Sequence, residues 1–571
     1  MARRPGNAGV KAFAAAVIPV MLAAATMTVL LAPSVAAVPA PLRSPVAAQV
    51  EPIPRQCANE ISDARARGVD VSRIAEDGIV IVGGRSIPVS GPDAQWRQRD
   101  ERDPTWTTRF HGMIWAVVAA LEGIPAVDLV LERRAALPDP GAAVGIAELQ
   151  ATGWTESAVR LRQATVNCLY LITGDQRLIP IVEELAQANL DPVRYWGLPL
   201  NPVHNHGILA NIVMLESAEV FGRGEWRDQA LRRLDADSGR VFAACGMTAE
   251  QSTHYHLVNV RLWSRILRDL PASPDAPVAQ AVAERIGTAT IALARLARPD
   301  GIIEAIGDGF PLRLPRDVAV EADPDPRLWC RQRGWAANRT SWDDSLVHYT
   351  LRFGPRPRFH GHLDQGSITW FAGGVPVFSD RGYYDTTRDD RSIRGRSAAY
   401  HSVFEPVGVT SRSVMTGRRM PSEVGDEYAL TWSQDGIEME RVVTIPLSET
   451  SLRVLDTGLS ADFRWWAQHW QLAPGWTPLP RRSIADPAAV HESGLYLYGA
   501  CSSRGFNPGR AVPVEAYPKR REVVPAWSLT CERLGARVRM ETLWVVSDVS
   551  GRFRWDPVAG TYEITAPAPL P

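Results

Sequence analysis

The spacing of the histidines is the first feature of this sequence that suggests chemistry. Six of the eleven histidines form three His-x-His pairs, which are His204 with His206, His254 with His256, and His360 with His362. On a β-strand, residues i and i+2 share one face, so His360 and His362 would point into one site, and Asp364 continues that face. On a helix the same spacing separates side chains by about 200°, so a pair there need not act together. The segment from His360 to Asp364 therefore predicts a metal site or an acid–base site.

Before position 298 the apolar residues follow a helical period. They recur at steps of three and four residues, as in Ile208, Ile212, Leu215 and Ala218. The pattern predicts helices at 110–121, 156–172, 205–221, 226–242, 251–270 and 278–297. Helices that follow one another without strands imply a helical layer, either a solenoid or a closed α/α toroid.

After Leu346 the pattern changes to a period of two. It predicts strands at 347–353, 367–371, 441–445, 452–455 and 538–544. Short strands separated by Gly, Pro and Asp turns are typical of an antiparallel β-sandwich. Residues 311–334 are rich in proline and alternate in charge, which indicates a linker. We therefore predict an α+β multidomain protein, with a helical domain at 50–320, an antiparallel β-sandwich at 335–571, and a cleft between them that suits an extended polymer.

The first 37 residues read as a secretory signal peptide. Arg3, Arg4 and Lys11 precede an apolar run at 13–31, and small residues follow at 34–37. The run is also just long enough for an uncleaved membrane anchor, which stays open. We expect the protein to be secreted or held at the cell surface or in the periplasm.

The six cysteines allow disulfides in an exported protein, because their number is even. Their wide spacing fits no metal motif, and the pairing cannot be derived from the sequence. Cys501 and Cys531 are the first pair to test, since both lie in the same strand-rich region.

The net charge of the chain limits how an anionic substrate can bind. The formal net charge is −1, so a general attraction to polyanions is absent and an anionic substrate needs a local site. Lys11 and Lys519 are the only lysines, which makes almost every cation an arginine. The planar guanidinium group suits carboxylates and sulfates.

Three separated stretches narrow the interpretation further. They are 201–207 (NPVHNHG), 247–256 (MTAEQSTHYH), and 358–366 (RFHGHLDQG) with its continuation at 378–384 (FSDRGYY) and 398–403 (AAYHSV). In order and spacing they resemble the heparinase II/III-type polysaccharide lyases, a family that includes alginate and heparan-sulfate lyases. The resemblance implies an α/α toroid joined to an antiparallel β-sandwich.

The resemblance also implies roles for individual residues. Asn205 and His206 match the pair that neutralises the uronate carboxylate, Tyr255 matches the tyrosine that acts as base or acid, and His360 matches the histidine that faces the substrate. His362, Asp380 and His401 match the ligands of a divalent metal, usually zinc. Arg394, Arg396 and Glu250 are candidate substrate-binding residues, although Glu250 equally fits a supporting position. The implied partner is an anionic uronate polysaccharide.

These residue types suit β-elimination. The C5 proton of a uronate is weakly acidic, so donors on the carboxylate must stabilise an enolate-like dianion. Asn205 and His206 can supply such donors, and a position at a helix start adds a favourable dipole. A neutral histidine suits the base, and a tyrosine suits the acid that protonates the leaving oxygen.

The sequence departs from the family pattern in two places. His401 is followed by Ser402 and Val403, where Asn-Thr is usual. A second tyrosine, which some members use as base, cannot be placed among Tyr383, Tyr384 and Tyr400. Which of His360 and Tyr255 is the base and which is the acid therefore stays open.

Plainer interpretations stand beside these roles. Tyr255 also fits a buried helix tyrosine, His401 a strand-end residue, and Asp380 a turn.

The sequence therefore predicts an exported polysaccharide lyase that leaves a 4,5-unsaturated uronate end. Three alternatives remain: a non-catalytic polysaccharide-binding or export-assembly protein, a uronate C5-epimerase, and an α/α-toroid glycoside hydrolase. The hydrolase would need two paired carboxylates, for which Glu216, Glu250 and Asp308 are available.

Overall fold

A computed structural model describes residues 57–196, 205–269, 276–315, 325–342, 346–358, 360–502 and 509–566. The predicted signal peptide at 1–37 and His204 lie outside these residues. None of the helices in the described part of the chain combines the length and the hydropathy that crossing a bilayer requires.

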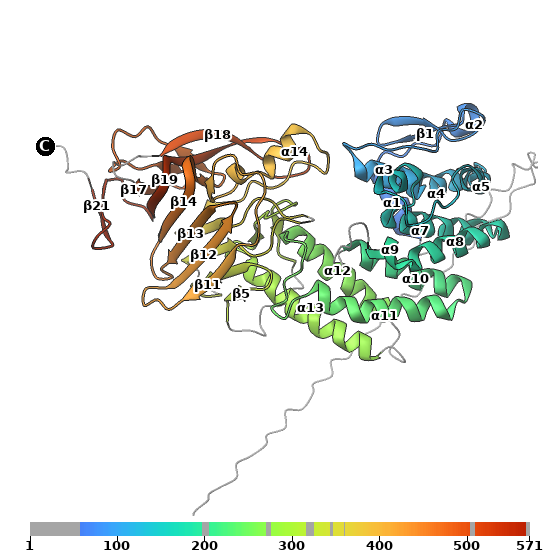
Figure 1. Ribbon diagram of the computed structural model, residues 1–571, viewed down its shortest axis with the longest axis horizontal. Coiled ribbons are helices and arrows are strands. Elements are labelled where there is room, and N and C mark those ends of the chain that lie inside the picture. Colours follow the sequence, from blue (N-terminus) through green and yellow to red (C-terminus); the bar gives the residue numbers. More distant parts are fainter. Residues whose placement is uncertain are drawn as a thin grey trace, which may run out of the picture. The chain divides into compact units, whose positions relative to one another are not determined.

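The N-terminal part of the described chain is helical (Figure 1). Its helices are α1 (Ala58–Ala66), α2 (Ile74–Asp77), α3 (Pro104–Gly112), α4 (Ile114–Leu121), α5 (Ala126–Ala136), α6 (Ile146–Thr152), α7 (Glu156–Thr173), α8 (Ile179–Leu190), α9 (Pro192–Trp196), α10 (Asn205–Phe221), α11 (Gly224–Val241), α12 (Thr253–Asp269) and α13 (Ala276–Leu296). One hairpin, β1 (Ile79–Val82) with β2 (Arg85–Pro88), interrupts them.

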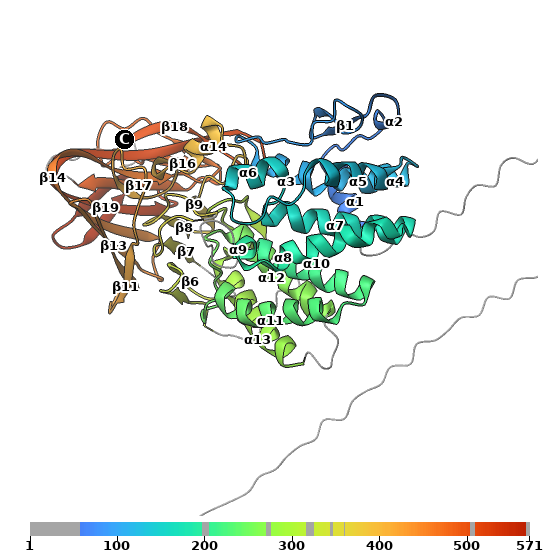
Figure 2. The ribbon, with the colours of Figure 1, turned by 45° about the vertical axis from the view of Figure 1, so that its right-hand side comes forward.

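Local sequence signals set the limits of α7. The Thr155 hydroxyl accepts a hydrogen bond from the backbone N–H of Ala158 at its start, and Gly174 adopts a left-handed conformation (φ 66°) at its end. Both are common helix boundaries. Figure 2 shows α7, α8 and α10 side by side, and α7 packs against α3, α4, α8 and α10.

One helix boundary differs from the prediction. The single helix expected at 110–121 is two helices, because Met113 takes a left-handed conformation (φ 54°) between α3 and α4. A Cβ atom on Gly112 would lie 2.7 Å from the Cβ of Leu161, so glycine permits the close approach of α3 to α7. The apolar period could not indicate this break, since it continues through it.

The C-terminal part is built from two antiparallel sheets. The five-stranded sheet has the order β5 (Leu328–Cys330), β6 (Trp335–Arg339), β7 (Val347–Arg352), β8 (Ile368–Ala372), β9 (Val375–Phe378). The ten-stranded sheet has the order β11 (Thr416–Met420), β12 (Asp426–Gln434), β13 (Ile437–Ile445), β14 (Ser451–Gln471), β19 (Val524–Ser547), β17 (Tyr496–Ser502), β16 (Ala489–His491), β15 (Trp476–Pro478), with β10 (Phe404–Pro406) on β14 and β18 (Arg510–Ala516) on β19.

Two small two-stranded sheets complete the strands. They are β3 (Ile302–Ile303) with β4 (Leu312–Arg313), and β20 (Arg552–Asp556) with β21 (Thr561–Thr565). The short β4 and β5 lie inside the stretch that was interpreted as a linker. The limits of the predicted domains stay predictions.

A single hydrophobic core joins the two large sheets. Side chains from the five-stranded sheet, such as Tyr349 and Trp370, belong to the same buried cluster as Tyr428, Trp466 and Trp544 from the ten-stranded sheet. In β13 buried positions alternate with more exposed ones, as expected for a strand with one face on a core. The predicted sandwich strands at 347–353, 367–371, 441–445, 452–455 and 538–544 correspond to β7, β8, β13, β14 and β19.

All six cysteines are paired in disulfides. Cys57 with Cys168 joins α1 to α7, Cys245 with Cys330 joins the chain after α11 to β5, and Cys501 with Cys531 joins β17 to β19. Their Cα–Cα distances of 5.3, 5.5 and 6.4 Å lie in the usual range.

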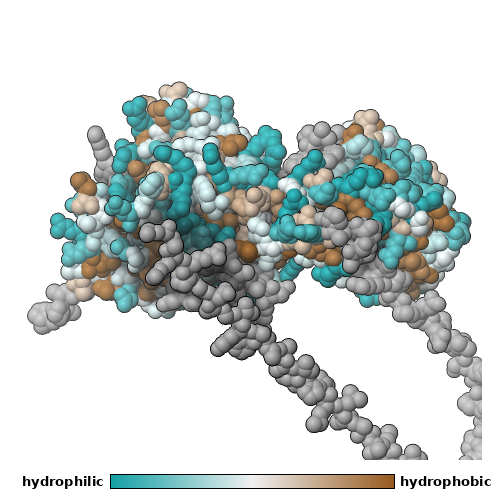
Figure 3. Space-filling model, turned by 90° about the horizontal axis from the view of Figure 1, so that it is seen from below, coloured by the Kyte–Doolittle hydropathy of each residue, from teal (hydrophilic) through white to brown (hydrophobic). Residues whose placement is uncertain are grey.

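On the face shown in Figure 3, hydrophobic side chains are scattered among hydrophilic ones.

We expect His348 to make stability depend on pH. It is 1% exposed in β7, and burial, followed by the charge of Arg339, lowers its pKa to about 3. In the unfolded chain its pKa is about 6.5, so below that pH only the unfolded chain binds this proton and stability falls with falling pH. Between pH 7.5 and 5.0 the free energy of unfolding should fall by about 2 kcal/mol more in the wild type than in His348→Gln. Urea denaturation at both pH values measures this, and equal losses in the two proteins would contradict it.

Candidate active site

The chain from Glu304 to Asp308 holds the candidate catalytic residues together. The backbone N–H of Thr253, at the start of α12, donates to the carbonyl of Ile306 (3.1 Å), and the Ser252 hydroxyl donates to the carbonyl of Asp308 (2.7 Å). On its other side, the Asp308 N–H donates to the carbonyl of His360 (2.8 Å). This segment therefore places the first turn of α12, with Tyr255, beside the loop that carries His360.

Gly307 makes this close approach possible. Its φ is +72°, and a Cβ atom would lie 2.5 Å from the carbonyl oxygen of Gln251 and 2.6 Å from that of His360. Gln251 then attaches the same loop from the helix side. Its side-chain amide donates to the carbonyl of Arg356 (3.0 Å) and accepts from the N–H of Arg358 (2.8 Å).

His360 and His362 do not lie on a strand, contrary to the sequence prediction. They belong to the loop between β7 and β8, whose conformation is set by its contacts with 304–308 and Gln251. The two rings nevertheless meet at one group, the carboxylate of Asp308. On α12 the pair diverges as expected: His254 lines a cavity, while His256 Nε2 points into the core and donates to the carbonyl of Ala289 (2.9 Å).

Asp308 is the centre of the site. It is 3% exposed, and its Oδ2 lies 3.0 Å from His360 Nδ1 and 2.8 Å from Arg396 Nη2. Its Oδ1 lies 2.9 Å from His362 Nε2. Burial alone would raise the pKa of Asp308, but the hydrogen bonds from His360 and His362 and the charge of Arg396 hold it well below its ordinary value. The carboxylate is therefore ionised and orients three side chains at once.

Tyr255 is stacked on His360. The ring centroids are 3.3 Å apart, and the rings are 4° from parallel. Burial, followed by the charges of Asp308 and Glu250, raises the pKa of Tyr255 to about 12, although Arg396 and Arg109 oppose this shift. Tyr255 therefore keeps its proton at neutral pH.

Glu250 is a buried residue that contacts two of the candidate catalytic residues. It is 1% exposed, and its Oε1 accepts from the Asn205 N–H (2.9 Å) and from Asn259 Nδ2 (2.6 Å). Its Oε2 lies 3.3 Å from His360 Nε2. This placement fits a residue that positions Asn205 and His360 more than one that contacts a substrate.

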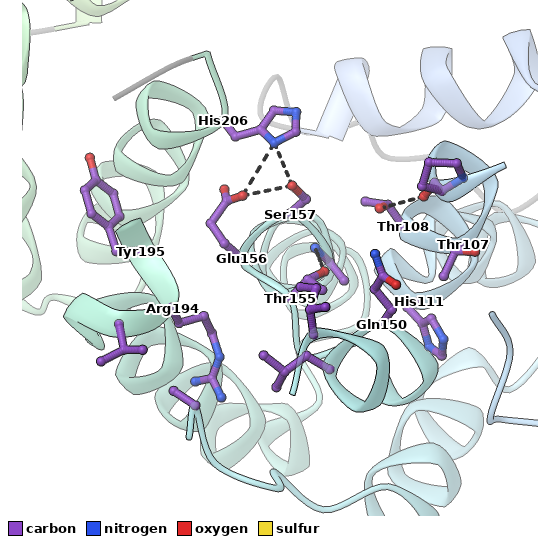
Figure 4. A pocket seen from close by; sticks show the side chains of 16 residues that line it. Thr107, Thr108, His111, Gln150, Thr155, Glu156, Ser157, Arg194, Tyr195 and His206 are labelled. Atoms are coloured by element: carbon purple, nitrogen blue, oxygen red, sulfur yellow. Dashed lines mark hydrogen bonds and ion pairs between the residues drawn. The ribbon is translucent and has the colours of Figure 1, made fainter. Parts of the chain in front are cut away.

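His206 lies next to Asn205 in the first turn of α10. Its Nδ1 is 2.7 Å from the Ser157 hydroxyl and 3.5 Å from Glu156 Oε2, both on α7, as the dashed lines in Figure 4 show. The side chain is 40% exposed. A cavity of about 230 Å³ lies on one side of it, lined by Tyr195, Arg194 and other residues drawn in Figure 4.

A larger cavity of about 690 Å³ collects three of the four predicted catalytic residues, and His360 is not among the residues that line it. Asn205, His206 and Tyr255 line it together with Asp308 and Tyr383. The Tyr383 hydroxyl is buried and has no partner in the described part of the chain, and burial raises its pKa. Arg396 lies over the Tyr383 ring at 5.3 Å. The helices and the C-terminal domain thus both contribute to one polar cavity.

The three predicted metal ligands lie close together and are almost completely buried. His401 Nδ1 is 2.8 Å from Asp380 Oδ2, and the His401 and His362 rings are 5.2 Å apart. His362 Nδ1 and His401 Nε2 are buried without a hydrogen-bond partner among the described residues. These two nitrogens and a carboxylate are donor types that a divalent cation accepts. No group of three or more His, Cys, Asp or Glu within the described ranges has the arrangement of a metal site, so the metal remains a prediction.

The remaining predicted residues are placed differently. Arg394 is exposed on α14 (Asp390–Gly395) and lines neither cavity, whereas Arg396, just after that helix, binds Asp308. Tyr384 packs against Tyr517, with ring centroids 5.5 Å apart.

The sequence prediction had not recognised Asp308 as the shared partner of both histidines, nor the arginines of the larger cavity. In the sequence, Asp308 was considered only as a carboxylate available to a glycoside hydrolase.

Comparison with known proteins agrees with this arrangement. Residues 323–493 match the sequence profile of the family described as Heparinase II/III-like, C-terminal. These residues form a heparinase II/III-like C-terminal domain. The resemblance predicted from the sequence motifs is thus confirmed. No curated protein sequence matches the chain significantly.

Solved structures with a similar fold cover most of the chain. A mutant heparan sulfate lyase from Pedobacter heparinus is 14% identical with a TM-score of 0.56, and the match covers 90% of this chain and 89% of that one. A structure of heparinase III is 13% identical with a TM-score of 0.62 and coverages of 88% and 86%. A second heparinase III, the BT4657 gene product, is 14% identical with a TM-score of 0.57 and coverages of 87% and 86%. The predicted fold, an α/α toroid followed by an antiparallel β-sandwich, is therefore confirmed.

The heparinase II/III-like domain contributes only part of the candidate site. His360, His362, Asp380 and His401 lie within the matched residues, whereas Asn205, His206 and Tyr255 lie on helices that precede them.

Proposed function

We propose that this protein is a polysaccharide lyase that cleaves a uronic-acid-containing polysaccharide by β-elimination. The observation that carries the proposal is the stack of Tyr255 on His360. The stack places the proposed acid directly against the proposed base, and Tyr255 lines the same cavity as Asn205 and His206. The fold, which is that of heparinase III, is compatible with this activity.

Asn205 and His206 are proposed to bind the uronate carboxylate. Removal of the C5 proton turns the ionised carboxylate into an enolate-like dianion, so donors that strengthen as this charge develops lower the barrier. Both residues line the cavity next to Tyr255, and the contact of Asn205 with Glu250 holds its backbone in place.

His360 is proposed to be the base. Its Nδ1 lies 3.0 Å from the ionised Asp308, so Nδ1–H donates to that carboxylate. Nε2 then carries the lone pair, and because Glu250 Oε2 lies 3.3 Å from it, the base role requires the uronate C5 proton to reach Nε2 beside this carboxylate. A carboxylate that fixes the imidazole tautomer in this way also stabilises the imidazolium that forms.

Tyr255 is proposed to be the acid. A pKa near 12 keeps the hydroxyl protonated, so it can donate to the departing O4 oxygen. In the full step the C5 proton moves to His360 Nε2, its electron pair forms the C4=C5 double bond, and the C4–O4 bond breaks as O4 takes the Tyr255 proton. The products are a 4,5-unsaturated uronate and a new chain end with a free hydroxyl.

A divalent metal, zinc being the expected one, is proposed to bind His362, Asp380 and His401. When bound, the cation would add positive charge and crosslink the loops that carry these residues. His362 also contacts Asp308, so the metal residues and the base share one neighbour.

Export is proposed as well. Three disulfides in the described residues are typical of proteins that fold in an oxidising compartment.

Two carboxylates that a glycoside hydrolase would need are already engaged. Glu250 and Asp308 are buried and face the same imidazole from its two nitrogens, so they do not flank a sugar. A C5-epimerase would share the base and the carboxylate site, and only the product separates it from a lyase.

The experiment that tests the function is an assay on a panel of uronans. Mature protein loaded with zinc should produce the ultraviolet absorbance of a 4,5-unsaturated uronate with at least one of alginate, hyaluronan and heparan sulfate. Inverted C5 configuration without absorbance would identify an epimerase. Folded, metal-loaded protein that changes none of these polymers would refute the lyase proposal.

Tyr255→Phe should reduce kcat by about a hundredfold or more, because positioned acid catalysis contributes on this order. Thermal unfolding should stay unchanged, since no described residue forms a hydrogen bond with the Tyr255 hydroxyl. Tyr428→Phe, which removes the hydroxyl of a buried tyrosine in the sandwich core, is the control and should retain activity. Retained activity in Tyr255→Phe would remove this residue from the mechanism.

His362→Ala should lose most bound metal, measured by elemental analysis of the purified protein, because one of three ligands is missing. His256→Ala is the matched control: this residue is also fully buried, but it contacts only the carbonyl of Ala289 among hydrogen-bond partners in the described chain. Circular dichroism checks that both variants are folded. Full occupancy in folded His362→Ala protein would contradict the ligand assignment.

A further inference from the structure

The 690 Å³ cavity holds a group of arginines that the mechanism above does not use. Arg67, Arg109 and Arg160 line it from the helical part, and Arg520 lines it from the C-terminal part. Arg160 has its own partner, Glu156, at 3.4 Å. The charges of Arg67, Arg109 and Arg520 are balanced differently.

These arginines share carboxylates in pairs. Asp63 serves both Arg67 (3.3 Å) and Arg109 (3.5 Å). Asp385 serves both Arg520 (2.7 Å) and Arg521 (2.5 Å). One carboxylate neutralises one guanidinium group, so each pair outnumbers the carboxylate that it shares, although Asp103 also acts on the charge of Arg521.

The two remaining charges act on each other inside the cavity. Arg109 is only 19% exposed. Burial lowers the pKa of its guanidinium group, and repulsion from Arg67 and from Arg520 lowers it further, while Asp63 opposes the shift. Glu60 also lines this wall, but burial raises its pKa, which reduces its ability to balance the arginines. A partly desolvated cation pair of this kind is stabilised by binding an anion.

The pair belongs to the same cavity as the proposed catalytic residues. Tyr255 lines that cavity, and the charge of Arg109 partly opposes the rise that burial causes in the pKa of its hydroxyl. An anion held between Arg109 and Arg520 would therefore lie close to a uronate positioned at Tyr255.

We propose that Arg109 and Arg520 form an anion-binding subsite for a carboxylate or sulfate on the sugar next to the scissile uronate. The proposal rests on the proposed function, because it treats the cavity as the substrate site. Guanidinium groups bind both anions through paired N–H donors, and in a chain of net charge −1 such a local site is what attracts a polyanion.

Arg520 and Arg521 offer a matched comparison. Both contact Asp385, but only Arg520 is among the residues that line the cavity. Replacing either one by glutamine leaves one arginine on that carboxylate, so the structural effects should be alike. Arg520→Gln should raise KM for a cleaved uronan about tenfold with little change in kcat, whereas Arg521→Gln should resemble the wild type.

The choice of polymer identifies the anion. Every sugar of alginate carries a carboxylate, whereas the sugar next to each uronate of heparan sulfate is a glucosamine, which carries sulfate but no carboxylate. An effect of Arg520→Gln on alginate alone therefore indicates a carboxylate, an effect on heparan sulfate alone indicates a sulfate, and an effect on both indicates a site that accepts either anion. Arg109→Gln should raise KM similarly, and the double variant should show less than the sum of the two losses in binding free energy if both arginines bind one anion.

A binding measurement separates failure of this proposal from failure of the lyase. Calorimetry with heparan sulfate and alginate oligosaccharides needs no turnover. In one outcome the wild type cleaves no uronan, while Arg520→Gln binds the oligosaccharides about tenfold more weakly than Arg521→Gln does. That result would support the subsite and refute the lyase proposal. Equal KM and Kd values for Arg520→Gln and Arg521→Gln on every polymer, or no binding of either oligosaccharide by the wild type, would overturn the subsite.

Discussion

A buried negative charge must be balanced, and in this protein the balance is made at Asp308. Its carboxylate is nearly inaccessible to water, so its ionised form depends on His360, His362 and Arg396 around it. Losing one partner of such a group costs several kcal/mol, because an uncompensated charge is left in a poorly polarisable environment. Asp308 thereby holds three side chains from the C-terminal domain against a segment that is itself hydrogen-bonded to α12.

This constraint makes the parts of the site depend on one another. The same carboxylate that would set the tautomer of His360 also contacts His362, the proposed metal residue, and Arg396. Tyr255 reaches the cluster from the helical side by stacking on His360. The proposed acid, the proposed base and the proposed metal ligands are therefore positioned by one polar network. Networks of this kind give well-defined geometry when all of their members are satisfied.

Positive charge in the larger cavity is treated differently, because it is not fully balanced by carboxylates. Arg396 is balanced by Asp308, but Arg109 and Arg520 each belong to a pair that shares a single carboxylate. The chain as a whole is almost neutral, so attraction for a polyanion has to be concentrated where arginines outnumber their partners. The proposed subsite is the place in the larger cavity where this occurs.

The sequence by itself determined the class of fold, because side-chain periodicity is a local property: steps of three and four residues marked the helices, and alternation marked β7, β8, β13, β14 and β19. It also indicated candidate histidines for a functional site, through pairs and ordered motifs. Only the tertiary structure decided that His360 and His362 lie in a loop, that Asp308 joins them, and that Cys57 meets Cys168 and Arg109 lies near Arg520. These contacts join residues between 52 and several hundred positions apart. No local pattern encodes them, because each depends on how whole elements pack and on which buried charges must be neutralised.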